Sequence, residues 1–283
     1  EEGVTAGDTV VIAVHPAGGP TGIARIAFDA VSSTSDTGGT VLSWSHTIGG
    51  GDNRLLVVTV GARDGTATDL AISAVTYDGV AMTAAPGGLK RQGSGTRAQT
   101  AIFYMLDADL PPAGSYPVEV TYAGSVDRRS GGAISLANVD QQGPEAVATN
   151  GVTAAAITSS ITTATDGAWV VDVVCINTGS GSAWTATGEA MVRRWNQCVS
   201  GGGHTAAGAT TPAPIAGETI LSWQVNTSGN QVAHSMAAFA PALVNLAPAA
   251  HAGPDQTVID TDGSGDEAVT LDGSASLDID GTI

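Results

Sequence analysis

The densest group of potential metal ligands in the chain is an acidic turn at residues 260–266. Asp260, Asp262, Ser264 and Asp266 place an oxygen-bearing side chain at every second position, interrupted by glycines. Oxygen ligands in such a loop suit a hard cation such as Ca²⁺. The turn begins like an EF-hand loop, but Leu271 stands where that loop needs a bidentate glutamate. The sequence therefore predicts Ca²⁺ as its one cofactor, bound by these four side chains, with a solvated acidic turn as the alternative.

Side chains that could carry out hydrolysis are present, but they follow no recognised spacing. Neither HExxH, GxSxG nor a Cys/His signature accompanies the five scattered histidines, which are His15, His46, His204, His234 and His251. Asp172 and Glu189 are candidates for a carboxylate pair only because both lie in predicted strands. Asp172 is better explained as a solvent-facing or hydrogen-bonded strand residue. We therefore predict that the chain has no catalytic residues and is not an enzyme.

Two tryptophans are the best candidates for ligand binding. Trp184 and Trp195 lie near predicted loops and could stack on sugar rings, whereas Trp169 and Trp223 fall on apolar strand faces and belong in a core. Asn226 begins an Asn-Thr-Ser sequence and is a candidate N-glycosylation site.

The chain contains two cysteines, Cys175 in an apolar strand and Cys198 in a Gly-rich loop. A disulfide between them is expected in an oxidising compartment. The alternative is a buried free thiol at Cys175.

The composition excludes several classes of partner. The formal net charge is −17, Lys90 is the only lysine, and no lysine or arginine follows Arg194. Nucleic-acid binding needs clustered cations, so that class is excluded. No apolar run is long enough to span a membrane. The acidic chain, rich in Gly, Thr and Ser, suits a secreted or cell-surface protein whose partners are its own copies, other surface proteins or glycans.

The chain contains an internal repeat that predicts its architecture. The segment from Asp52 to Met82 is repeated from Asp166 to Met191, and the segment after Pro111 is repeated before Asn226. In this alignment Val57 corresponds to Val171. Short strands about ten residues apart with no helical period predict an antiparallel sandwich. Because aromatics make up only 4% of the chain, we expect the two half-units, about 40–140 and 157–241, to share one two-sheet sandwich, with two Ig-like domains as the alternative.

Two local patterns predict individual elements of the first half-unit. The run from Leu55 to Val60 is nearly all apolar, so we expect a central strand that is covered on both faces. Asp78-Gly79 is flanked by apolar residues and predicts a two-residue hairpin turn.

The C-terminal residues resemble a known family. Asn245–Pro248, Ala252–Gln256, Val269–Ser274 and Asp278–Gly281 resemble the opening of a PKD (polycystic-kidney-disease) repeat. This resemblance implies the start of an Ig-like spacer domain of the kind common in surface and secreted proteins. More loosely, the preceding region resembles the jelly-roll modules of bacterial secreted proteins. The expected fold is thus all-β, a jelly-roll-like sandwich at 23–243 followed by a partial PKD domain at 244–283.

Residues 1–22 are expected to form a strand and a Gly/Pro linker outside the sandwich. The strand, residues 4–14, must pair with some sheet edge to satisfy its backbone groups. It can add to its own sandwich or, through Val10, Ile12 and Val14, to a neighbouring subunit, which would build a fibre. We therefore expect a non-catalytic extracellular structural or adhesive segment. The alternative is a carbohydrate-binding module of a larger secreted polysaccharide-degrading enzyme.

Overall fold

The computed structural model describes residues 9–12, 24–65, 69–178, 182–199, 203–227 and 230–243, and residues 250, 251, 253, 254, 256–259, 262–264, 270 and 272–276. The chain divides into two compact units, one of residues 24–242 and one of residues 1–23 with 243–283. Among the described residues there is no helix long and apolar enough to cross a membrane.

The first half of the larger unit consists of two antiparallel sheets. The larger sheet has the order β2-β11-β4-β9-β7, with β8 also on β9, and the smaller has the order β3-β10-β5-β6. The strands are β2 (Ala27–Thr37), β3 (Val41–Ile48), β4 (Leu55–Asp64), β5 (Ile72–Tyr77), β6 (Val80–Ala81), β7 (Thr83–Ala84), β8 (Lys90–Gln92), β9 (Arg97–Leu106), β10 (Gly114–Tyr122) and β11 (Arg128–Ala137). A short 3-10 turn, Asp107–Asp109, precedes β10.

The second half repeats this arrangement. Its larger sheet has the order β12-β19-β14-β17-β16, and its smaller sheet has the order β13-β18-β15. The strands are β12 (Ala146–Ala154), β13 (Ala156–Thr163), β14 (Ala168–Ile176), β15 (Trp184–Ala186), β16 (Val192–Cys198), β17 (Thr205–Ala213), β18 (Gly217–Val225) and β19 (Asn230–Phe239).

The strand orders confirm an all-β fold built from two related jelly-roll halves. In each half, the chain crosses repeatedly between the larger and the smaller sheet, and the resulting strand orders follow the double Greek-key path of a jelly roll. β4 takes the same place in the first half as β14 in the second, as the correspondence of Val57 with Val171 predicts.

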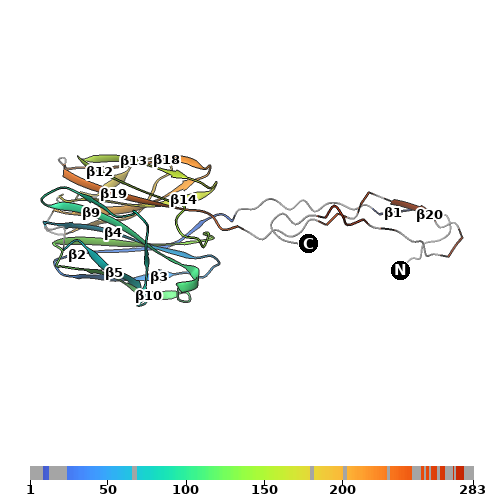
Figure 1. The fold of residues 1–283 in the computed structure, drawn as a ribbon, viewed down its shortest axis with the longest axis horizontal. Coiled ribbons are helices and arrows are strands. Elements are labelled where there is room, and N and C mark those ends of the chain that lie inside the picture. The colour runs from blue at the N-terminus through green and yellow to red at the C-terminus, as the bar shows by residue number, and fades with distance from the viewer. Residues whose placement is uncertain are drawn as a thin grey trace. The chain divides into compact units, whose positions relative to one another are not determined.

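The expectation that the halves share one two-sheet sandwich is wrong. Figure 1 shows four layers, with β10 and β5 outermost on one side and β13 and β18 outermost on the other. The two larger sheets face each other in the middle, where β9 lies against β19 and β4 lies against β14. Each half therefore has its own core, and a further apolar layer joins the halves.

Small residues allow the two middle sheets to come close without many aromatic side chains. A Cβ atom on Gly61 of β4 would lie 2.6 Å from the Cβ of Ala206 on β17. Trp195 on β16 packs its indole ring against Gly132 on β11 and Gly208 on β17. Close backbone approach thus replaces side-chain bulk, which is why a chain so poor in aromatics can build four layers.

Strand β4 confirms that a nearly all-apolar run is a central strand covered on both faces. Leu56, Val58 and Val60 lie in the core of the first half, whereas Leu55 and Val57 lie in the layer between the halves. Successive side chains point to opposite faces of a sheet, so a strand buried on both faces needs no polar alternation. The predicted hairpin at Asp78-Gly79 is also present, and both residues have positive φ (50° and 77°), as a tight two-residue turn requires.

The N-terminal strand has a partner that neither sequence-based alternative named. β1 (Thr9–Ile12) pairs antiparallel with β20 (Gln256–Ile259), in a register that joins Thr9 to Ile259 and Ile12 to Gln256. This pairing is shorter than the predicted strand 4–14, and Val14 lies outside the described residues. The backbone groups on one edge of β1 are therefore paired within the chain by the C-terminal segment.

Candidate functional site

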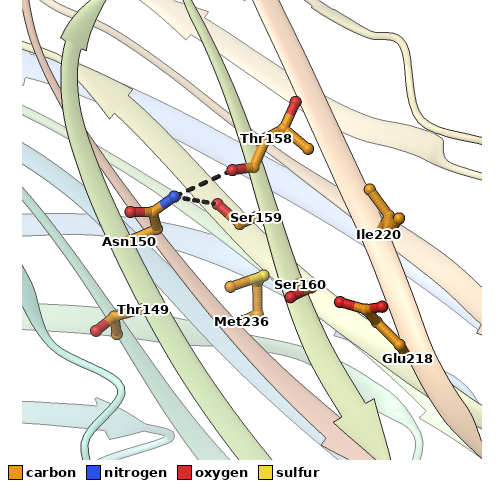
Figure 2. Close-up of a pocket in the computed structure, with 8 residues that line it drawn as sticks. All are labelled: Thr149, Asn150, Thr158, Ser159, Ser160, Glu218, Ile220 and Met236. Atoms are coloured by element: carbon orange, nitrogen blue, oxygen red, sulfur yellow. Dashed lines mark hydrogen bonds between the residues drawn. The ribbon is translucent and has the colours of Figure 1, made fainter.

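A groove opens along one side of the second half, between the edge strands of its two sheets. It has a volume of about 390 Å³. Figure 2 shows its lining, which comes from both edge strands and from the next strand of each sheet: Thr149, Asn150, Thr158, Ser159, Ser160, Glu218, Ile220 and Met236. Six of these eight side chains carry a hydroxyl, an amide or a carboxylate, so the rim of the groove is polar.

Ser159 connects the groove to a buried chain of hydrogen bonds. Its Oγ lies 2.8 Å from Nδ1 of His234, and Nε2 of His234 lies 2.8 Å from Oδ2 of Asp172. Asn150 donates from Nδ2 to Ser159 Oγ at 3.2 Å and to the Thr158 carbonyl at 3.0 Å (Figure 2). His234 and Asp172 are fully buried, whereas Ser159 keeps 6% of its surface exposed and lines the groove.

Asp172 has two further donors that fix it in place. The backbone N–H of Ala209 donates to Oδ1 at 2.8 Å, and the indole N–H of Trp223 donates to Oδ2 at 2.6 Å. Trp223 lies on β18 in the smaller sheet, so it holds the carboxyl group from across the core. Buried polar groups remain stable when they are paired in this way.

The hydrogen-bonded group divides the core of the second half. Apolar side chains lie in one cluster around Trp184 and Trp223, and in another around Leu221 and Met236. The core between the two sheets of the first half is a single cluster.

The first half shows that the fold does not need this polar group. By the register of the strands, Trp44 takes the place of Ser159, Gly131 that of His234 and Val58 that of Asp172. The ring of Trp44 covers Gly131, with Cη2 2.6 Å from where a Cβ on that glycine would lie. The first half therefore has apolar packing at the positions where the second half has a serine, a histidine and an aspartate.

Two other histidines are buried in networks of their own. His46 lies between the hydroxyls of Ser32 (2.9 Å) and Ser135 (3.2 Å), and burial lowers its pKa to about 4. His204 lies 2.7 Å from the Ser130 hydroxyl, and burial lowers its pKa to about 3, with the nearby Arg63 and Arg128 acting in the same direction. Both imidazoles are therefore neutral at pH 7.

Asp172 and His234 carried a signal that spacing motifs did not capture. Asp172 interrupts the apolar run Ala168–Ile176, and His234 lies in the similar run Asn230–Phe239. An ionisable side chain in a strand buried on both faces needs a partner, so each residue implied another. Glu189, the other carboxylate singled out, lines a different hollow, whereas Asp172 is fully buried, so the two carboxylates do not meet in one cleft.

The proposed sugar platform of Trp184 and Trp195 is wrong. Trp184 is fully buried, packs edge to face on Trp223 and donates from Nε1 to the Thr205 carbonyl. Trp195 is 4% exposed and donates from Nε1 to Thr59 Oγ1, across the layer between the halves. Both rings fill cores and have no face free for a ligand.

The expected disulfide is also absent, and both thiols are free. Cys175 lies opposite Ala206 on one side of β17, and Cys198 lies opposite Thr205 on its other side. Strands that flank a third strand are about 10 Å apart. A disulfide requires Cα atoms within roughly 7 Å of each other, so the intervening strand prevents the bond.

We expect the two thiols to react very differently in the native protein. Burial raises the pKa of the Cys175 thiol to about 12, whereas Cys198 is partly exposed. A thiol-specific reagent should therefore label Cys198 readily and Cys175 only after unfolding. Cys198→Ser should remove the native labelling and leave one thiol in the denatured protein. If neither cysteine is labelled in denaturant without a reductant, the two thiols are joined and the disulfide prediction is correct after all.

The remaining predicted sites lie partly outside the described residues. Asp262 and Ser264 are exposed, and the backbone N–H of Ser264 donates to Asp262 Oδ1 at 2.9 Å, whereas Asp260 and Asp266 are not described. Within the described part of the chain, no three His, Cys, Asp or Glu side chains gather closely enough to hold a metal ion. Asn226 is exposed, as a glycosylation site must be.

Comparison with known proteins adds no relative. No family model matches the chain, and no curated protein sequence matches it significantly.

Proposed function

We propose that this chain is a segment of an extracellular structural or adhesive protein, in which residues 24–242 present a binding surface. The path of the chain carries this proposal. The backbone N–H of Ala24 donates to the carbonyl of Ala242 at 3.0 Å, so the chain enters and leaves the jelly-roll pair at one place. The rest of that surface is free of covalent connections, as in a module carried by its flanking segments. The net charge of −17 and the resemblance to a PKD repeat support an extracellular setting.

The polar groove supports glycan binding as the alternative role, that of a carbohydrate-binding module. Hydroxyl, amide and carboxylate groups on its rim can pair with sugar hydroxyls. A second hollow of about 610 Å³ shares Glu218 and Ile220 with the groove, so an extended ligand could occupy both. Buried Trp184 and Trp195 take no part in this mode of recognition.

A glycan array probed with the full chain tests both roles. We expect retention of a polyhydroxylated ligand and a loss of about tenfold or more in Glu218→Gln, because the substitution replaces a charge-assisted hydrogen bond from a bound hydroxyl with a weaker neutral one. Glu119→Gln makes the same change on β10 of the first half and should bind normally. If no glycan and no extracellular matrix protein is retained, the binding role is wrong.

Two further parts of the proposal concern the smaller unit. Fibre formation would require β1 to exchange its β20 partner between copies, which is a domain swap. Electron microscopy of the native chain beside a form lacking residues 1–18 tests this, and monomers in both samples would contradict it.

If the acidic turn binds calcium, calorimetry should measure binding in the millimolar range. The absence of a heat signal would mean that the turn is only a solvated acidic loop.

A further inference from the structure

We propose that Ser159 is an activated nucleophile that cleaves short-chain esters of polyhydroxylated alcohols in the groove between β12 and β13. This activity goes beyond adhesion, which requires no bond to be broken. It also departs from the expectation, based on the sequence, that the chain is not an enzyme.

The hydrogen-bond donors around Asp172 determine which atom donates and which accepts in each hydrogen bond from Ser159 to Asp172. Trp223 Nε1 and the Ala209 backbone nitrogen can only donate, and a carboxylate accepts both of their hydrogen bonds and a third from His234. The imidazole proton then lies on Nε2, which leaves Nδ1 as an acceptor. Ser159 therefore donates its hydroxyl proton to Nδ1 across 2.8 Å, within the range required of a general base.

This arrangement matches the roles of a serine–histidine–aspartate triad with the two ring nitrogens exchanged. His234 serves as the base, and Asp172 is a positioning residue that holds the imidazole tautomer. Asn150 Nδ2 lies 3.2 Å from Ser159 Oγ, where it can also donate to an oxyanion formed beside that atom.

The first half indicates that Ser159, His234 and Asp172 are not required for folding. The same strands there carry Trp44 over Gly131, with Val58 in place of Asp172. A buried aspartate costs desolvation energy that an apolar packing avoids, so its presence in one half needs another explanation. A role in chemistry supplies that explanation.

The lining of the groove indicates the class of substrate. Met236 is apolar, is almost completely buried and lines the groove (Figure 2), so it can contact a short acyl chain. Thr149 and Glu218 are exposed and polar, so they can pair with hydroxyls of the alcohol. An acetylated sugar has both of these parts.

The reaction balances with water as the only co-substrate. Ser159 Oγ forms a bond to the acyl carbon while its proton passes to His234 Nδ1. The ester C–O bond then breaks, and the same proton goes to the departing alkoxide. A water molecule, deprotonated by His234, attacks the acyl-serine and releases the carboxylic acid, and the proton returns to Ser159.

A fluorophosphonate probe and 4-nitrophenyl acetate test the proposal on the full chain. We expect one probe per chain, located on Ser159 by peptide mass spectrometry, and ester turnover that Ser159→Ala abolishes. His234→Asn should slow labelling about 100-fold or more, because a general base typically contributes a factor of that size. Asp172→Asn should move the pH profile of labelling to lower pH, since it removes the charge that stabilises the imidazolium.

Ser45→Ala is the matched control, because Ser45 is an exposed serine on β3, at the register position in the first half that Ser160 has in the second, and it lies outside the groove. This variant should react with the fluorophosphonate probe and hydrolyse the ester at the same rates as the unsubstituted protein. The proposal is overturned if folded protein, verified by its thermal transition, carries no probe on Ser159. Labelling that occurs on another residue, or that is as fast in His234→Asn, overturns it as well. Glycan retention is measured in a separate experiment. The presence or absence of esterase activity therefore does not decide whether the chain has the adhesive role.

Discussion

Lowering the pH from 7 to 4 is expected to destabilise the jelly-roll pair by several kcal/mol. Burial lowers the pKa of His46 to about 4 and that of His204 to about 3, from 6.5 in an exposed histidine. Below pH 6.5 the unfolded chain therefore binds protons that the native protein cannot bind. Stability falls as the pH falls, until each buried histidine is protonated near its own native pKa. Each histidine accounts for about 3 kcal/mol or more, since one pKa unit corresponds to about 1.4 kcal/mol.

The slope of unfolding free energy against pH separates this effect from other acid-sensitive groups. Denaturant titrations between pH 4.5 and 6.5 should give a shallower slope in His46→Asn and in His204→Asn, by about 1.4 kcal/mol per pH unit each. The slope is informative even if either variant is less stable throughout. His251→Asn changes an exposed histidine and should leave the slope unaltered. Equal slopes in all four proteins would show that the buried imidazoles do not govern acid stability.

Trp195→Ala is expected to cost about 3–5 kcal/mol of unfolding free energy, the range for removing a large buried aromatic side chain. Trp195 is 4% exposed and belongs to the apolar layer that joins the two halves. Its removal would leave a cavity between Gly132 and Gly208, whose backbones hold the ring from two strands. Urea unfolding should show this loss, while Val192→Ala, an exposed position on the same strand, should change little.

A double-mutant cycle makes the test of Trp195 specific to this contact. Gly132→Leu alone should destabilise the protein, because a Cβ there would meet the indole ring. In the Trp195→Ala background, the new leucine has the vacated space and should cost much less, or even stabilise. The two substitutions are therefore expected to be strongly non-additive. Additive effects would mean that the ring does not lie on Gly132.

Much of the fold followed from local patterns in the sequence. The correspondence of Val57 with Val171 identified the two halves, and the apolar run at Leu55–Val60 marked a central strand. Asp78-Gly79 predicted its hairpin because positive φ at both positions is a local requirement. Such features depend on neighbouring residues and on periodicity, so they can be found without knowing which sheets meet.

The tertiary structure alone decided what lies at the surface and which polar groups meet. Proximity to a loop suggested that Trp184 and Trp195 were exposed, but packing between sheets buries both. The number of layers could not be predicted either, since it depends on how closely Gly61 allows Ala206 to approach.

The candidate site shows the same limit most clearly. His234 is 75 residues from Ser159 and 62 from Asp172 in the chain, and its counterpart in the repeat is a glycine. Internal alignment therefore gave no reason to select it. The sequence placed Asp172 in an apolar strand and left open whether its carboxyl group faces solvent or is hydrogen-bonded. Only the pairing of β14 with β19 in one sheet could decide that the partner is His234. Only the stacking of the smaller sheet on the larger could decide that Ser159 connects both residues to an open groove.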